Sequence, residues 1–150
     1  MRLAGLGLAA LVLTTPADAT SIERVTLPQM ERSATVVFVG RAVAHRPLRV
    51  GASLGGVRYR FEAVRFLRGG PTRVVHLTFP ELPGLSTGVV LGRRQLVFAE
   101  PRRFGAARER RLTASGYPQG VYLRVAAGRF ANGANGAVRL DRLARRLRTG

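Results

Sequence analysis

Apolar and polar residues alternate in several short stretches of the chain, and each of these stretches predicts a β-strand. Residues 57–63 alternate without a break, so the odd-numbered side chains are expected to face a core and the even-numbered ones to face solvent. The phase changes at Val64, which indicates a β-bulge near Ala63-Val64. Residues 73–79 alternate in the same way, with Val75, Leu77 and Phe79 on one face.

The other predicted strands are less regular. Residues 35–43 begin with apolar side chains on both faces and then alternate, a pattern typical of a strand that is buried on both sides and emerges at its end. Further apolar runs, each bounded by turn residues, predict strands over residues 95–99, 120–125 and 137–140.

Glycine, proline and charged residues predict the connections. Residues 46–56 contain Pro47 and three glycines and are expected to form a loop. Residues 102–111 are polar and basic and are also expected to form a loop. Residues 128–136 are rich in glycine and asparagine and predict a flexible hairpin connection; they lack the lysine and the following helix of a phosphate loop.

Two segments have helical character. Thr26 and Gln29 have the spacing of a capping box, which predicts a short helix over Leu27–Ser33 with Leu27 and Met30 on its buried side. Near the C-terminus, leucines at positions 140, 143 and 147 recur at helical spacing. They allow either a helix docked on the domain with its arginines outward or a frayed terminus. If the tail is a polyanion contact, deletion of residues 141–150 is expected to weaken heparin or DNA binding and to change stability little.

Five or six short strands with little helix predict an all-β fold, a small antiparallel barrel like the OB-fold. The barrel is expected to be monomeric and to span residues 20–140, followed by a basic tail over residues 141–150. Its predicted core consists of Val37, Val39, Tyr59, Phe61, Val75, Leu77, Leu96 and Phe98.

Residues 1–19 have the pattern of a secretory signal peptide. Arg2 is followed by an apolar run over residues 3–13, and Ala17 and Ala19 have the spacing of an A-x-A cleavage site. The run is too short to span a bilayer as a stable helix. We therefore expect an exported protein, periplasmic or secreted, that begins at Thr20 and has no membrane span.

The chain is strongly basic, with a formal net charge of +17, and all 25 of its basic residues are arginine. The absence of lysine points to the codon usage of a GC-rich genome, which weakens any argument from the choice of arginine. A charge of this size favours anionic partners such as nucleic acid, acidic polysaccharide or lipid head groups. The alternative is a merely solvated charged face. The candidate polyanion contacts are Arg102, Arg103, Arg108, Arg110, Arg111, Arg139, Arg142, Arg145, Arg146 and Arg148.

No cluster of residues predicts catalysis, a metal or a cofactor. The chain has no cysteine and only two histidines, which excludes disulfides, thiol chemistry and a multi-histidine zinc site. His76 and Glu81 could form a general base with a carboxylate partner, but an exposed strand histidine is the simpler interpretation, and His45 has no acid nearby in sequence. Glu62 lies between Arg60 and Arg65 on the outward face and is expected to form weak cross-strand ion pairs.

Four aromatic residues have two interpretations. Tyr59, Phe61, Tyr117 and Tyr122 could stack nucleic-acid bases among arginines. Tyr59 and Phe61 share a predicted face with Val57 and Ala63, so we expect them to fill the core instead.

The order of these features resembles a known family. A short helix is followed by strands over residues 34–43, 59–69 and 92–98, the second ending in Leu67-Arg68-Gly69 and the third containing Leu96-Val97-Phe98. This layout, over residues 27–125, is similar to exported bacterial OB-fold proteins related to tissue inhibitors of metalloproteinases and netrin-like modules. The resemblance implies an OB-fold and a binding role. It implies no inhibitory site, because the inhibitors use an amino-terminal cysteine and disulfides that this chain lacks.

Two functions follow as expectations. The first is a non-catalytic exported module that binds a protein partner through barrel loops over residues 46–56 and 80–88. The second is a polyanion-binding protein that uses the arginines named above. Salt separates the two, because only the second requires displacement of counterions.

Overall fold

The computed structural model describes residues 23–50, 54–70, 72–80, 85–104 and 108–149. The predicted signal peptide, residues 1–19, lies outside these residues. Neither helix in the described ranges has the length and apolar character that crossing a membrane requires.

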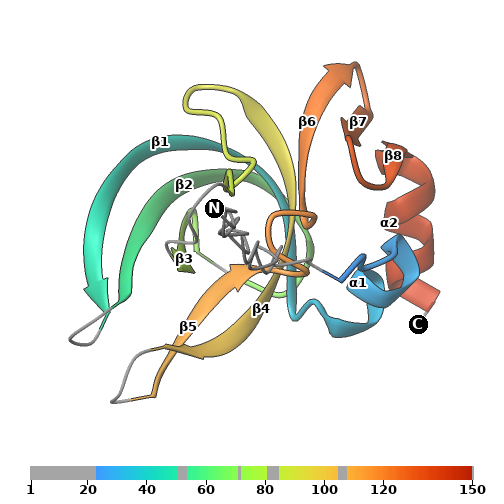
Figure 1. Ribbon diagram of the computed structural model, residues 1–150. Helices are drawn as coiled ribbons and strands as arrows, with labels where there is room; N and C mark the ends of the chain where they lie inside the picture. Colours follow the sequence, from blue (N-terminus) through green and yellow to red (C-terminus); the bar gives the residue numbers. More distant parts are fainter. Residues whose placement is uncertain (1–22, 51–53, 71, 81–84, 105–107, 150) are drawn as a thin grey trace, which may run out of the picture.

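One eight-stranded antiparallel sheet curls into a half-barrel, with two helices packed beside it (Figure 1). The helices are α1 (Leu27–Ser33) and α2 (Leu140–Thr149). The strands are β1 (Val36–Val50), β2 (Leu54–Arg68), β3 (Val74–Pro80), β4 (Arg94–Phe104), β5 (Glu109–Ala114), β6 (Val121–Ala126), β7 (Arg129–Asn132) and β8 (Gly136–Arg139). The strand order is β3-β2-β1-β4-β6-β7-β8, and β5 pairs with β4.

Strands β1 to β5 form a partly open barrel. Strand β3 lies at one end of the sheet and β5 hangs from β4, and the two approach each other across a groove without being paired in the described residues. A small antiparallel barrel of this kind is the fold class that the alternating segments predict. The sheet has eight strands rather than five or six, because two further strands, β5 and β7, form in or extend from segments predicted as connections.

The predicted loop over residues 46–56 is wrong for residues 46–50 and 54–56, which extend β1 and β2; residues 51–53 lie outside the description. These strands pair as far as Val50 with Leu54. Strand β1 pairs with β4 only up to Arg41, so Pro47 lies where β1 has a neighbour on one side only. Sheets accept proline at such edge positions, which is why Pro47 does not end the strand.

The predicted loop over residues 102–111 is also wrong. Strands β4 and β5 form a hairpin in which Arg102 pairs with Arg111 and Arg103 pairs with Arg110; the tip, residues 105–107, lies outside the described part. Polar composition indicated a loop, but backbone pairing holds this ribbon together and most of its arginine side chains face solvent. Likewise, the predicted connection over residues 128–136 contains β7, which pairs with β8.

The predicted β-bulge in the second strand is confirmed. Gly40 pairs with Ala63 and Val39 pairs with Arg65, so Val64 has no partner in β1. Val64 is 62% exposed, which is unusual for a large apolar side chain. The extra residue lets β2 bend around the barrel.

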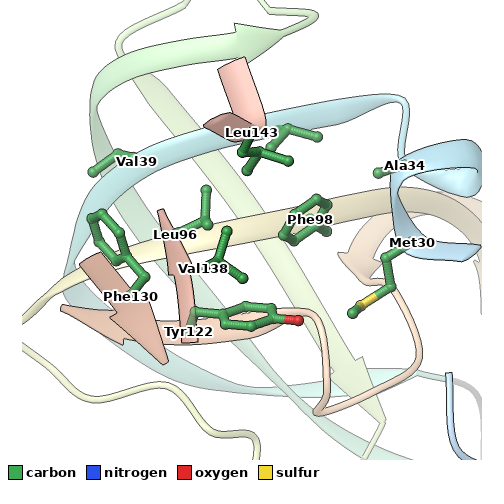
Figure 2. Close-up of a cluster of buried hydrophobic side chains, with 10 residues drawn as sticks. Met30, Ala34, Val39, Leu96, Phe98, Tyr122, Phe130, Val138 and Leu143 are labelled. Carbon is green, nitrogen blue, oxygen red and sulfur yellow. The ribbon is translucent and has the colours of Figure 1, made fainter. Parts of the chain in front are cut away.

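Buried side chains form two clusters on opposite faces of β1 and β4. One cluster fills the barrel and includes Phe38, Phe61 and Leu77. The other joins the outer face of β1 and β4 to the two helices and β6 to β8, and Figure 2 shows Leu96, Phe98 and Leu143 within it. Successive side chains of β1 point alternately into the two clusters, which explains the apolar run at the start of this strand. The start of β1 is buried on both sides, as predicted. All predicted core residues are buried except Tyr59, which is partly buried against the barrel core.

Both segments with helical character in the sequence form helices, as predicted. At the start of α1 the Thr26 backbone N–H donates to Gln29 Oε1 at 2.7 Å, as the capping box predicts. In α2 the Leu143 side chain is fully buried, so the C-terminal leucines mark a docked helix rather than a frayed end. An ion pair of 2.6 Å between Arg146 and Glu31 links α2 to α1.

At Gly120 the backbone packs too closely for a side chain. The effect of a substitution there can be compared with that at Gly133, where there is open space. A Cβ at Gly120 would lie 2.6 Å from Ser115 O and 2.8 Å from Phe98 O, so Gly120→Ala should lower the free energy of unfolding by about 1–3 kcal/mol. Nothing lies within 4 Å of a Cβ built at Gly133, so Gly133→Ala should change it by less than about 0.5 kcal/mol. Denaturant unfolding measures both, and equal losses would contradict the close approach.

Candidate functional site

The first group of predicted arginines lies on the β4–β5 hairpin. Arg102 donates to Glu100 at 2.9 Å, and Arg111 donates from Nε to Glu109 at 3.0 Å. The other three members, Arg103, Arg108 and Arg110, are exposed and form no ion pair with a described residue. The hairpin therefore has an excess of positive charge that its own acids do not neutralise.

The second group lies on β8 and α2. Asp141 accepts hydrogen bonds from Arg139, which lower the pKa of its carboxyl, and Arg145 lies 3.8 Å from the same carboxylate. With Arg146 paired to Glu31, Arg142 and Arg148 are the two exposed members of this group without an ion pair to a described residue. Two acids, Asp141 and Glu31, thus face the five arginines of this group, which also keeps an excess of positive charge.

The structure does not bring the two groups together. Figure 1 shows the β4–β5 hairpin projecting from one side of the half-barrel and α2 lying on the other side. The predicted set of ten arginines is therefore two separate surfaces, each with five arginines against two acidic partners.

A third basic cluster, not predicted as a site from the sequence, lies on the outer face of β1, β2 and β3. Arg58 and Arg60 alternate with core residues of β2, so they point away from the barrel interior. Arg46 is directly opposite Arg58, and His76 is directly opposite Arg60. The alternation of residues 57–63 already placed two of these side chains outward. The missing information was the strand register, and Arg46 had been assigned to a loop.

The charge of this cluster affects His76. Burial, followed by the positive charges of Arg58, Arg60 and Arg46, lowers the pKa of the His76 imidazole below its usual value of about 6.5. His76 is consequently neutral at pH 7, as expected for a base among cations that lack a counterion.

A groove connects this cluster to the hairpin. It has a volume of about 610 Å³ and runs between β3 and β5, with Arg58 and His76 on one wall and Arg110 and Arg111 on the other. A smaller hollow of about 330 Å³ adjoins it and shares Arg58 and His76. The outer-face cluster and the hairpin thus form one continuous surface, which we call the basic groove.

The described residues do not test the candidate pair of His76 and Glu81. Glu81, the predicted partner of His76, lies outside the described residues. His45 is exposed and packs against the Tyr59 ring at 5.6 Å between centroids. Glu62 forms no ion pair with any described residue, so its predicted cross-strand pairing is wrong. Across the described ranges, no group of three metal-ligating side chains comes together.

The aromatic side chains fill the core. Phe61 and Tyr122 are fully buried, and Tyr59 and Tyr117 pack against the barrel cluster through Phe79. Burial raises the pKa of Tyr122 to about 12, in keeping with its place inside the molecule. The core-filling interpretation is confirmed, and these rings do not form a stacking platform.

Comparisons with protein-family models, with curated proteins and with solved structures found no match to this chain. The resemblance to inhibitor-like and netrin-like modules therefore stays a prediction, and the function has to be argued from the basic groove.

Proposed function

We propose that this chain is a non-catalytic, exported binding module that holds an acidic polysaccharide along its basic groove. Export rests on the sequence of residues 1–19. The binding role rests on charge, because closely spaced cations on a concave surface raise the local concentration of an anionic polymer.

The observation that carries this proposal is the imbalance of charge on the described surface. Glu31, Glu100, Glu109 and Asp141 are each already paired with an arginine. Arginines without an ion pair lie on several parts of the described surface, and six of them gather on the groove and the hairpin: Arg46, Arg58, Arg60, Arg103, Arg108 and Arg110. An external polyanion would supply the missing counterions, and the release of small ions from the polymer would favour binding.

The aromatic residues argue against single-stranded nucleic acid as the ligand. Proteins that bind single strands stack bases on accessible aromatic rings. Every phenylalanine and tyrosine in the described ranges is buried or half-buried. A polymer recognised by its charged groups alone, such as a sulfated or carboxylated polysaccharide, fits this surface better.

A protein partner bound through barrel loops is the second proposal. Most of residues 46–56, one of the two loops on which that prediction depended, belong to β1 and β2. We therefore rank it behind polysaccharide binding.

A panel of ligands at one salt concentration tests the proposal. Fluorescently labelled heparin, a neutral dextran and a single-stranded DNA oligonucleotide would each be titrated with the protein residues 20–150. We expect saturable binding of heparin and none of dextran. Binding of DNA more tightly than heparin, or of no polyanion at all, would contradict the polysaccharide assignment.

A further inference from the structure

The outer-face cluster places positive charges close together, which destabilises the protein when no ligand is bound. Arg46 and Arg58 are directly opposite on neighbouring strands, and cross-strand pairs of like charge destabilise a sheet. Arg60 and His76 are directly opposite on the next pair of strands. Three arginines and two histidines from three strands, Arg46, Arg58, Arg60, His45 and His76, line one hollow of about 330 Å³.

The hollow also contains a donor without an acceptor. Arg58 Nε is buried and has no hydrogen-bond partner, although buried polar atoms are normally satisfied. Neither Arg46, Arg58 nor Arg60 forms an ion pair with a described acid. An unpartnered buried donor and unneutralised guanidinium groups both indicate a place for an anion.

From these observations we propose that Arg46, Arg58, Arg60 and His76 form a binding site for one tetrahedral oxyanion, the sulfate or phosphate ester group of a bound polymer. Guanidinium groups present paired N–H donors whose spacing matches the oxygens of such a group. The site rests on the proposed polyanion binding only for the identity of the polymer, and its affinity for a free oxyanion is independent of it.

The position of the site indicates the path that a bound polymer would follow over the surface. Arg58 and His76 line both this hollow and the larger groove, in which Arg110 and Arg111 face them from β5. An ester group held by the site would therefore direct the rest of the polymer between β3 and β5 toward the hairpin.

The anion should also change the protonation of His76. The charged and titratable groups around it are Arg58 and Arg60 from β2, Arg46 and His45 from β1, and Glu109, Arg110 and Arg111 from β5. Burial and, after it, the β1 and β2 arginines lower the pKa of His76 in the free protein, so an anion that neutralises these arginines should raise it. Oxyanion binding should accordingly tighten as the pH falls through the pKa of His76.

The test uses inorganic sulfate and inorganic phosphate as probes and the His76 imidazole resonances in NMR as the readout. We expect saturable shifts and a higher pKa of His76 with either anion present, at constant ionic strength set by chloride. Arg58→Gln and the more exposed Arg60→Gln should each abolish the saturable shift, and each should weaken heparin binding by about tenfold or more. Arg142→Gln on α2, far from the site, should change neither.

Two results would overturn the site: His76 resonances that follow ionic strength alone, or Arg58→Gln, Arg60→Gln and Arg142→Gln weakening heparin binding equally. Saturable sulfate binding without heparin binding would support the site and contradict the polysaccharide function. Heparin binding without any specific shift at His76 would do the reverse, so the two failures are distinguishable.

Discussion

Deleting residues 141–150 is expected to destabilise the whole domain, by more than the about 2–5 kcal/mol typical of truncating one buried leucine to alanine. The segment contains two buried side chains: Leu143, which has no solvent-exposed surface, and Ala144, which is 5% exposed. It also contains Arg146, whose ion pair with Glu31 joins the two helices. The leucine spacing alone left open a tail that could be removed without loss of stability, and the buried side chains contradict that alternative.

A matched pair of substitutions on the same helix isolates the packing contribution. Leu143→Ala should lower the free energy of unfolding by about 2–5 kcal/mol, because it leaves a cavity in the buried cluster that also contains Phe98 and Met30. Arg142→Ala, at the neighbouring exposed position, should change it by less than about 0.5 kcal/mol. Denaturant midpoints that move equally for both would show that α2 does not contribute to the core.

The fold could be predicted from the sequence largely because apolar and polar residues alternate in β2 and β3. Residues 57–63 and 73–79 have their buried positions as expected, and the phase change at Val64 located the bulge. These features depend on local patterns of side chains, which a single sequence contains.

The missed strands have a common physical cause. The ends of β1 and β2, the β4–β5 hairpin and β7 have glycine, proline, arginine or asparagine where an apolar pattern would be expected. Their pairing depends on backbone hydrogen bonds between segments, which composition does not reveal. In β7, for example, Asn132 donates to Gln119 O at 2.6 Å and so ties the hairpin to the turn before β6.

The candidate site was only partly predictable for the same reason. The sequence identified Arg110 and Arg111, but not that they lie across a groove from Arg58 and His76. The sequence also does not show which acid pairs with which arginine. Glu31 pairs with Arg146, although 115 positions separate them in the chain. Strand register and tertiary packing decide which arginines remain unpaired.

The second large effect concerns the charge of the hairpin. Arg103, Arg108 and Arg110 are exposed and have no ion pair with a described acid, so replacing all three with glutamine should leave the fold intact. The variant should bind heparin much more weakly at low salt, because each lost contact also removes the release of a counterion. A triple variant of this kind measures the contribution of the hairpin without disturbing Arg102 or Arg111, which are paired with glutamates.

A control variant should lose the same net charge as the hairpin variant, but at positions away from the basic groove. Arg24, Arg142 and Arg148 replaced with glutamine remove the same number of charges away from the basic groove. If net charge alone attracted the polymer, this variant and the hairpin variant would lose the same affinity. We expect the control to retain most of its affinity, since contacts beyond a Debye length of about 10 Å at 0.1 M salt are largely screened.

The most direct test of polyanion binding is the slope of log affinity for heparin against log salt concentration, measured for the wild-type protein and for the hairpin variant. We predict a steep decrease with salt for the wild type and a shallower one for the variant, in proportion to the ionic contacts removed. An affinity that does not change with salt, or identical slopes for the two proteins, would contradict the account and favour a partner recognised by shape.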